Sequence, residues 1–310
     1  MRCCVIGGGG FIGLSLVKEL IETGRDVLVV GRHQELPKEF PAKAQYVVGD
    51  YGNRDFFSKI INQCDEVINL AYSTVPQTSF VDPIFDLQSN LPPNINLLEM
   101  AKNLDHLRSI LIVSSGGTVY GPVKHLPISE DISTLPISPY GITKLTIERY
   151  AVMFYRLHGI PVKIVRPSNA YGPRQKPFTG QGFISTAIGR IVLGNDVIVY
   201  GDRGSIRDYI HVCDLVRGIV ATLDQGEVGE VYNIGSGIGR DNRAVLDFII
   251  PLAKSDGYTV KIRTEALRNF DVPSNVLNFG KLLACSGWMP TIPFESGVFQ
   301  MWNAISKKLV

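Results

Sequence analysis

The sequence Gly7-Gly8-Gly9-Gly10-Phe11-Ile12-Gly13 decides the fold because of its place in the chain. An apolar run over 2–6 precedes it, as in a buried strand, and apolar residues follow at helical spacing over 11–23. Glycines between a strand and a helix permit a tight turn, close approach of a pyrophosphate and close packing of helix on sheet. The helix start adds unpaired N–H groups for phosphate. The loop therefore predicts a dinucleotide site built from Gly7, Gly10, Phe11, Ile12 and Gly13.

Apolar strands and helical segments alternate through the rest of the first half. Strands are expected at 26–30, 45–48, 66–71, 108–114 and 162–166, and helices near 54–62, 94–102 and 139–158. Pro92 and Pro93 are expected to delay the start of the second of these helices. Such alternation is typical of a parallel sheet with helices on both faces. We therefore predict an α/β fold with a Rossmann-like, doubly wound parallel sheet.

The composition of the sequence changes after Pro167, where Gly, Pro and aromatic residues become frequent. Short strands are expected beyond this point near 196–200 and 230–234, with helices near 184–193, 212–224 and 243–254. We predict an NAD(P)-binding Rossmann domain over residues 1–170. A smaller C-terminal α/β domain over residues 171–310 follows, and some of its segments return to the first domain.

The composition narrows the choice of partners. The 310 residues include 31 basic and 29 acidic side chains, and no long basic run occurs, which argues against nucleic acid. The five cysteines form no CxxC and no cluster with metal spacing, so we expect no metal and a reducing compartment. No apolar run reaches the roughly 18 residues of a membrane span, and no signal peptide precedes the first strand. We expect a soluble, cytoplasmic protein.

The end of the second strand bears on the choice between NAD and NADP. An acidic residue usually stands there and binds the ribose hydroxyls of NAD, but this strand ends in Gly31-Arg32. Arg32 either faces the 2′-phosphate of NADP or is a solvated side chain beside NAD. Asp50, followed by Tyr51 after the third strand, either meets the adenine or caps a turn. Both questions stay open at this point.

Tyr140 and Lys144 stand near the start of the long helix expected at 139–158. Residues four apart share one face of a helix, so both side chains can line one pocket. A neighbouring ammonium and a cationic nicotinamide favour the phenolate and lower the pKa of a tyrosine. The pair therefore predicts a phenol that acts as a base near neutral pH.

Taken together, these motifs resemble the extended short-chain dehydrogenase/reductase family, and within it the UDP-glucose 4-epimerase-like nucleotide-sugar epimerases and dehydratases. The resemblance covers nearly the whole chain. Besides the glycine loop and the Tyr–Lys pair, it rests on the segments Asn69-Leu70-Ala71, 114–121, 166–175, 207–212, 232–235 and 287–290.

The resemblance implies a mechanism and a set of contacts. Tyr140 takes a proton from a sugar hydroxyl while hydride passes to the nicotinamide, and Lys144 holds the nicotinamide ribose. Leu70 and Ala71 belong to the cofactor site. The family positions that contact the nucleotide diphosphate are Asn169, Arg207 and Arg268. The resemblance also implies a homodimer that pairs through two helices, and a place in polysaccharide biosynthesis.

One departure from the family pattern concerns the catalytic Ser or Thr, whose position is Gly116 here. Ser115 and Thr118 flank it, and either can supply the hydroxyl. The dehydratases place an acidic pair next, where this chain has Gly117 and Thr118, which argues against 4,6-dehydration. We predict a C4 epimerase of UDP-glucose or UDP-N-acetylglucosamine that uses bound NAD(P). The alternatives are an NADPH-dependent nucleotide-sugar 4-ketoreductase and a catalytically silent relative that binds dinucleotide.

Overall fold

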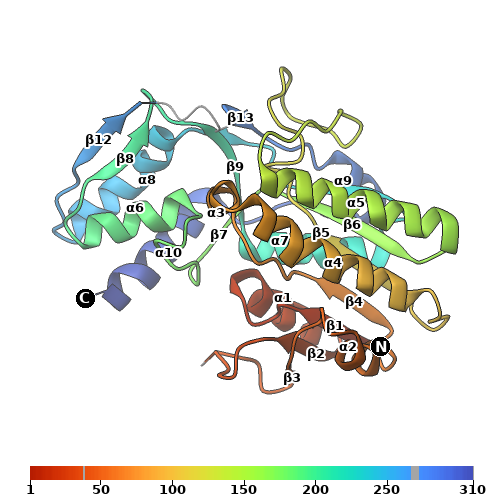
Figure 1. Ribbon diagram of the computed structural model, residues 1–310. Coiled ribbons are helices and arrows are strands. Elements are labelled where there is room, and N and C mark those ends of the chain that lie inside the picture. Colours follow the sequence, from red (N-terminus) through yellow and green to blue (C-terminus); the bar gives the residue numbers. More distant parts are fainter. Residues whose placement is uncertain (38, 267–271, 310) are drawn as a thin grey trace.

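A parallel sheet organises the larger lobe of the molecule (Figure 1). The computed structural model describes residues 1–37, 39–266 and 272–309. Within these ranges, seven parallel strands follow the order β10-β6-β5-β4-β1-β2-β3, that of a doubly wound dinucleotide-binding sheet extended by β10. The strands are β1 Arg2–Ile6, β2 Asp26–Gly31, β3 Gln45–Val48, β4 Glu66–Asn69, β5 Ser109–Val113, β6 Val162–Pro167 and β10 Val231–Ile234. The predicted fold class is confirmed.

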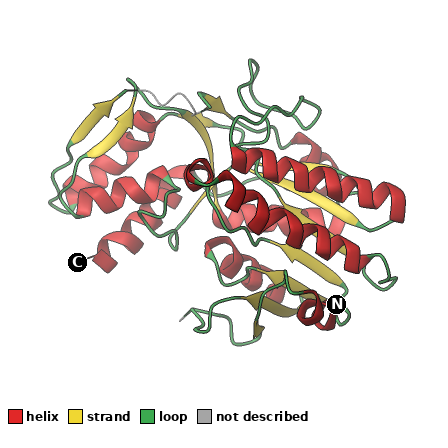
Figure 2. Cartoon of the chain, in the orientation of Figure 1, coloured by secondary structure: helices red, strands yellow, loops and turns green. Residues whose placement is uncertain are grey.

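Helices cover both faces of this sheet (Figure 2). One face carries α1 Phe11–Glu22, α7 Val212–Gln225 and α9 Gly280–Ser286, and the other carries α2 Arg54–Ile61, α4 Pro83–Ala101 and α5 Pro139–His158. Successive residues of β2 point to opposite faces, so Val29 packs with α1 while Val30 packs with α2 and α4. Both faces are therefore apolar, as the uninterrupted apolar runs predict. No helix of the described residues is long and apolar enough to cross a membrane.

The helix expected at 94–102 is longer than the sequence indicates, because α4 begins at Pro83 and continues through Pro92 and Pro93. The two prolines remove backbone donors from the middle of the helix. Side chains on its buried side hold the turns together, since Asn90 Nδ2 donates to the carbonyl of Asp86 at 2.7 Å and Asn94 Nδ2 to that of Asn90 at 2.8 Å. A short helix that the sequence did not predict, α3 Pro76–Val81, precedes α4.

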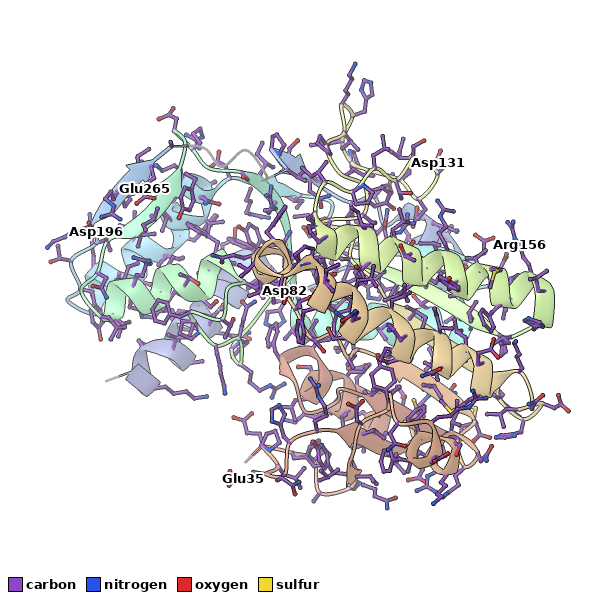
Figure 3. All side chains as sticks on the ribbon, viewed as in Figure 1. Glu35, Asp82, Asp131, Arg156, Asp196 and Glu265 are labelled. Carbon is purple, nitrogen blue, oxygen red and sulfur yellow. The ribbon has the colours of Figure 1, made fainter. Side chains whose placement is uncertain are left out.

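The smaller lobe has its own apolar core. Two parallel strands, β8 Val197–Tyr200 and β12 Ile262–Glu265, pack with α6 Phe183–Val192, α8 Asn242–Ser255 and α10 Phe294–Leu309. In Figure 3 the labelled Asp196 and Glu265 lie on the outside of this lobe, whereas Asp82 lies near the junction with the larger one. Short strands join the lobes: β7 Asn169–Tyr171, β9 Ile206–His211, β11 Gly239–Arg240 and β13 Ser274–Asn275.

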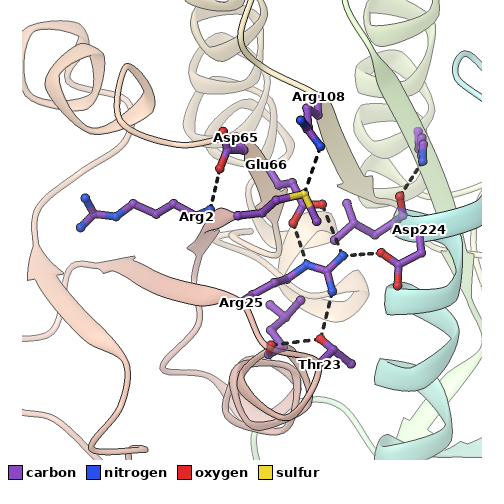
Figure 4. A network of polar contacts seen from close by, with 11 residues as sticks. Arg2, Thr23, Arg25, Asp65, Glu66, Arg108 and Asp224 are labelled. Atoms are coloured by element: carbon purple, nitrogen blue, oxygen red, sulfur yellow. Dashed lines mark hydrogen bonds and ion pairs between the residues drawn. The ribbon is translucent and has the colours of Figure 1, made fainter.

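A buried ion-pair cluster closes the amino-terminal edge of the main sheet (Figure 4). Arg25, which precedes β2, donates from Nε to Glu66 Oε2 of β4 at 2.7 Å and from Nη2 to Asp224 of α7. Its Nη1 donates to Thr23 Oγ1 at 2.9 Å. Arg25 and Glu66 are both buried, so each compensates the desolvated charge of the other. This cluster fixes α7 against the edge of the sheet opposite to the glycine loop.

Candidate active site

A cavity of about 620 Å³ lies at the carboxyl ends of the strands, where the two lobes meet. The glycine loop and the start of α5 line it from the larger lobe, and β7, β9 and the start of α8 line it from the other side. In open α/β sheets, ligands bind at this edge. The cavity therefore brings the predicted dinucleotide loop and the predicted catalytic pair to one place.

The glycine loop forms a cradle that side chains would close. Gly7 has a φ of +81°, and a Cβ at this residue would lie 3.1 Å from the backbone nitrogen of Ala71. A Cβ at Gly13 would lie 2.6 Å from the carbonyl oxygen of Gly7, so only glycine lets α1 pack this closely. Gly10 caps α1 without a side-chain hydrogen bond. The first N–H groups of α1 thus stay available to an anion, and the cradle fits a pyrophosphate.

Leu70 lines the cavity beside this cradle, together with Phe11 and Ile12. The other predicted cofactor residues, Arg32, Asp50, Tyr51 and Ala71, do not line it. Asp50 Oδ1 accepts a hydrogen bond from the Gly52 nitrogen at 2.8 Å, which is the turn-capping role left open by the sequence. Tyr51 is buried, and its hydroxyl accepts from Asn94 Nδ2 at 3.2 Å.

Tyr140 and Lys144 both line the cavity from the first turns of α5. The helix starts where it does because Ser138 caps it, with its Oγ accepting from the Gly141 nitrogen at 3.1 Å, and because Pro139 suits the first turn. The Tyr140 nitrogen donates to Ser79 Oγ of α3 at 3.1 Å. These contacts fix the end of α5 that carries both side chains.

Lys144 is a buried cation held without an ion pair to any described carboxylate. Its Nζ donates to the carbonyl of Val113, at the end of β5, over 2.8 Å and lies 4.0 Å from the ring centroid of Tyr72. Burial lowers the pKa of Lys144 to about 7, although the negative charges of Glu148 and Asp86 act in the opposite direction. The ammonium therefore loses its proton far more easily than an exposed lysine.

The phenol of Tyr140 differs from the sequence-based expectation. Burial and then the charge of Asp86 raise the pKa of Tyr140, and a hydrogen bond with Ser115 lowers it in part. The Lys144 Nζ lies 5.8 Å from the ring centroid of Tyr140. Within the chain itself, burial and Asp86 thus outweigh the groups that favour the phenolate.

Ser115 and Thr118 are the two candidates for the catalytic hydroxyl, because the family's Ser or Thr position is Gly116 in this chain. The structure distinguishes between them. Ser115 lines the cavity and its hydroxyl lowers the pKa of Tyr140, whereas Thr118 lines the cavity with its Oγ1 buried and without a protein partner. A Cβ at Gly116 would lie 2.4 Å from Cδ1 of Leu277. A side chain at this position is therefore blocked unless Leu277 moves.

Two further residues beside the catalytic pair escaped the sequence analysis. The ring of Tyr72 lies edge-on to that of Tyr140 with centroids 4.7 Å apart, and its hydroxyl is 3.5 Å from Oδ2 of Asp86. Asp86 is fully buried on α4 and also accepts from the Thr74 hydroxyl. The sequence holds one signal for Asp86. This residue stands one helical turn before Asn90, on the side of α4 that is buried.

The opposite wall of the cavity holds the predicted substrate residues. Asn169 and Arg207 both line it. Asn169 Nδ2 donates to the carbonyl of Asp208 at 3.3 Å, and Arg207 Nη1 to that of Ile206 at 2.9 Å. Gln175, which the sequence analysis did not single out, also lines the cavity, and its buried Oε1 has no protein partner. Arg268 lies outside the described residues.

A glycine cradle before a helix, with a tyrosine and a lysine in the same cavity, is the arrangement of a dinucleotide-dependent enzyme of the short-chain dehydrogenase/reductase class. The sequence model of the NAD dependent epimerase/dehydratase family matches residues 3–235. The chain belongs to this family, and it is an enzyme with NAD as its cofactor. Among the described residues, no group of His, Cys, Asp and Glu could hold a metal ion.

Relatives agree with this assignment along the whole chain. A UDP-glucose 4-epimerase from Mycolicibacterium smegmatis is 30% identical over 305 residues, covering 96% of either chain. A dTDP-glucose 4,6-dehydratase from Actinoplanes sp. is 30% identical over 312 residues, covering 96% of this chain and 95% of its own. The crystal structure of the Thermotoga maritima UDP-glucose 4-epimerase with UDP-glucose superposes with a TM-score of 0.92, at 30% identity and full coverage of both chains.

Proposed function

We propose that this enzyme is a C4 epimerase of a UDP-hexose, UDP-glucose or UDP-N-acetylglucosamine. The observation that carries the proposal is the placement of Tyr140, Lys144 and Ser115 on one wall of a cavity whose floor is the glycine cradle. The similarity to two UDP-glucose 4-epimerases over the full chain supports this substrate class. Polysaccharide biosynthesis is the cellular process that such a reaction serves.

Each side chain then has a defined task. The phenolate of Tyr140 takes the proton of the sugar 4-hydroxyl and later returns it, while Ser115 donates a hydrogen bond to the phenolate oxygen. Lys144 holds the nicotinamide ribose, for which its Nζ keeps free donors besides the bond to Val113. The glycine cradle would hold NAD, which would supply a reversible hydride acceptor for C4 and a cationic ring that favours the phenolate. Lys144 is buried and Tyr140 and Ser115 are partly buried, which limits the access of water to the keto-sugar.

The nucleotide diphosphate is proposed to lie on the wall formed by the smaller lobe. Arg207 supplies a guanidinium group, which suits phosphate oxygens, and Asn169 supplies an amide. The resemblance to the family adds Arg268 as a second candidate guanidinium. We propose a cofactor domain over 1–170 and a nucleotide-sugar domain over 171–310, and the place of β10 in the main sheet supports the return of later segments to the first domain. Binding across the lobes would hold the sugar over the nicotinamide.

Two other reactions fit the residues less well. A 4,6-dehydratase needs acidic side chains where this chain has Gly117 and Thr118, and both of these line the cavity. A 4-ketoreductase would use NADPH in net turnover, and the missing carboxylate at Gly31 is the observation in its favour. Ser115 lines the cavity together with Tyr140 and supplies a hydroxyl that Gly116 lacks, which argues against a silent relative.

A homodimer is proposed through α4 and α5, which lie side by side on the outside of the sheet (Figure 1). An exposed stripe on α5 contains Ile142, Met153 and Leu157, and Ile84 and Leu87 are exposed on α4. Exposed apolar side chains on two adjacent helices support an interface at this place. Light scattering during gel filtration would report twice the 34.1 kDa chain mass, and Met153→Glu would shift it to a monomer.

Incubation of the enzyme with each UDP-hexose, followed by chromatographic separation of the epimers, tests the proposed reaction. We expect interconversion without net change in absorbance at 340 nm. The Tyr140→Phe variant should lose about 10²–10⁴-fold in kcat, because proton transfer by a positioned group contributes that much. Net consumption of NADPH by a 4-keto-sugar, without epimer formation, would instead establish the ketoreductase.

A further inference from the structure

A tyrosine of the neighbouring strand β3 fills the space beside Gly31, the last residue of β2. A Cβ built at Gly31 would lie 2.3 Å from the hydroxyl oxygen of Tyr46 and 3.0 Å from its Cζ. Tyr46 stands on β3, opposite Val29 in the register, and Gly31 follows Val29 on the same face. A side chain at position 31 and the phenol of Tyr46 would therefore occupy the same space.

This phenol also borders the dinucleotide cradle. A Cβ at Gly9 would lie 3.8 Å from Cε2 of Tyr46, and a Cβ at Gly8 would lie 2.8 Å from Cγ1 of Val29. Gly9, Gly31 and Tyr46 thus share the face of the sheet on which α1 begins. In dinucleotide-binding sheets, the adenosine ribose lies between the glycine loop and the end of the second strand. The hydroxyl of Tyr46 stands where the acidic side chain of that strand would otherwise stand.

The hydroxyl is held by one bond and has acceptor capacity left. Tyr46 donates to the carbonyl oxygen of His33 at 3.1 Å, so its two lone pairs remain for a ribose hydroxyl. The ring is fixed edge-on against Phe40, with centroids 5.5 Å apart. Burial raises the pKa of Tyr46 and the bond to His33 lowers it, with no described carboxylate acting on it. The phenol stays neutral at physiological pH.

We infer that Tyr46 replaces the missing carboxylate as the acceptor for the adenosine ribose hydroxyls, and that the enzyme consequently discriminates only weakly between NAD and NADP. A carboxylate rejects NADP because its charge faces the 2′-phosphate. A neutral phenol exerts no such repulsion, and the exposed Arg32 follows directly after Gly31. The inference concerns the cofactor site of the family and does not depend on which sugar is the substrate.

Two readouts that need no activity test this inference. The dinucleotide released from the purified enzyme by denaturation can be identified chromatographically, and we expect both NAD and NADP. Isothermal titration of protein freed of its dinucleotide should give dissociation constants for NAD and NADP that differ by less than tenfold. A wild-type preference for NAD of tenfold or more would overturn the inference.

Three variants assign the effect to Tyr46. Tyr46→Phe keeps the ring but loses the acceptor, and should weaken NAD about 2–12-fold, the equivalent of one hydrogen bond. The double variant Gly31→Asp, Tyr46→Ala places a carboxylate at the end of β2 and removes the phenol that fills this space. It should bind NAD at least a hundredfold more tightly than NADP, because the carboxylate repels the 2′-phosphate. Tyr258→Phe, whose ring packs on Trp302 in the smaller lobe, is the matched control and should bind as wild type.

The single variant Gly31→Asp separates steric from electrostatic effects. Its side chain collides with Tyr46, so we expect weak binding of both dinucleotides and a lowered melting temperature, both relieved by the added Tyr46→Ala change. Unchanged binding of NAD by Tyr46→Phe would show that the phenol does not touch the ribose and would overturn the inference. Epimerase activity does not enter these measurements, so failure of the proposed reaction would be seen separately.

Discussion

Two buried cations stand at opposite edges of the same sheet, and only one of them is neutralised by ion pairs. Arg25, at the amino-terminal edge, bonds Glu66 and Asp224 together with the Thr23 hydroxyl. Lys144, at the carboxyl-terminal edge, bonds one carbonyl and lies over the Tyr72 ring, with its nearest acids acting only from a distance. Burial is similar at the two places, but the partners differ.

The comparison separates a structural charge from a reactive one. At Arg25, carboxylates repay the desolvation cost and raise the pKa of the guanidinium, so the charge is permanent. At Lys144, desolvation exceeds the compensation, and the pKa falls to about 7. A group whose charge is held so weakly can respond to a cofactor or substrate, which is where perturbed pKa values cluster in enzymes.

Removing the arginine tests the structural half of the comparison and should have the largest effect. Arg25→Met leaves Glu66 buried with no cation, and breaking a buried pair in this way costs about 3–5 kcal/mol. Urea denaturation monitored by circular dichroism measures the free energy of unfolding. The double variant Arg25→Met, Glu66→Leu should recover most of the loss, because no unpaired charge remains. A loss below about 1 kcal/mol in the single variant would show that solvent reaches the cluster.

Removing Lys144 tests the other half of the comparison. It should raise the free energy of unfolding, whereas removing Arg25 lowers it. The pKa of Lys144 falls from 10.5 in the unfolded chain to about 7 in the folded one, so the folded state binds fewer protons in this range. Lys144→Met should therefore stabilise the protein by a few kcal/mol below pH 7, and the gain should vanish as pH rises from 7 to 10.5. Thermal melts at pH 6, 8 and 10 measure this trend. A gain independent of pH would mean that packing alone is responsible.

The sequence predicted what depends on local pattern and missed what depends on tertiary packing. The glycine loop, the ends of α5 and the buried strands follow from turn chemistry, caps and apolar runs, and all are found as predicted. The extent of α4 was wrong, because the helix continues through Pro92 and Pro93 with one side buried and packed against α5. Propensity rules count the backbone donors that the prolines remove but not the packing of the helix in the folded protein.

The chemistry of the site was predictable to a similar degree. Spacing places Tyr140 and Lys144 on one helix face, and both line the cavity. Tyr72 and Asp86 reach the pair from segments far away in sequence, so their spacing from Tyr140 and Lys144 does not reveal them. The electrostatic balance at Tyr140 then differs from the prediction, because it depends on burial and on Asp86 more than on the neighbouring lysine.

Two hydroxyl variants distinguish the residues beside Gly116 and should have smaller effects on the rate. Ser115→Ala removes the hydroxyl that lowers the pKa of Tyr140, and the loss of one hydrogen-bonding group corresponds to about a 2–12-fold drop in kcat. Thr118→Val keeps the shape and removes an Oγ1 that has no protein partner, so its kcat should change less than twofold unless the sugar binds there. A larger loss in Thr118→Val than in Ser115→Ala would reverse the assignment.

The smallest expected effect is a shift of the kcat–pH profile on substitution of Asp86. This carboxylate acts on Lys144, one of the two compared cations, and on the catalytic Tyr140. Its charge raises the pKa values of both Tyr140 and Lys144, and it is surrounded by Tyr72 and Thr74 from the segment after β4. Asp86→Asn removes that charge but keeps an acceptor for the Thr74 hydroxyl. Both pKa values should then fall, so the acid limb of the kcat–pH profile should move to lower pH, since catalysis needs the phenolate.

The same helix offers a matched control for this shift. Asp82 caps α4 by accepting from the Phe85 nitrogen at 2.8 Å, and an asparagine can cap equally well. Asp82→Asn removes a charge of the same sign one turn away from Asp86, so its pH profile should stay that of the wild type. If both variants shifted the acid limb alike, the effect would reflect the overall charge of α4. A shift in Asp86→Asn alone would show that one buried carboxylate holds back the ionisation of the catalytic phenol.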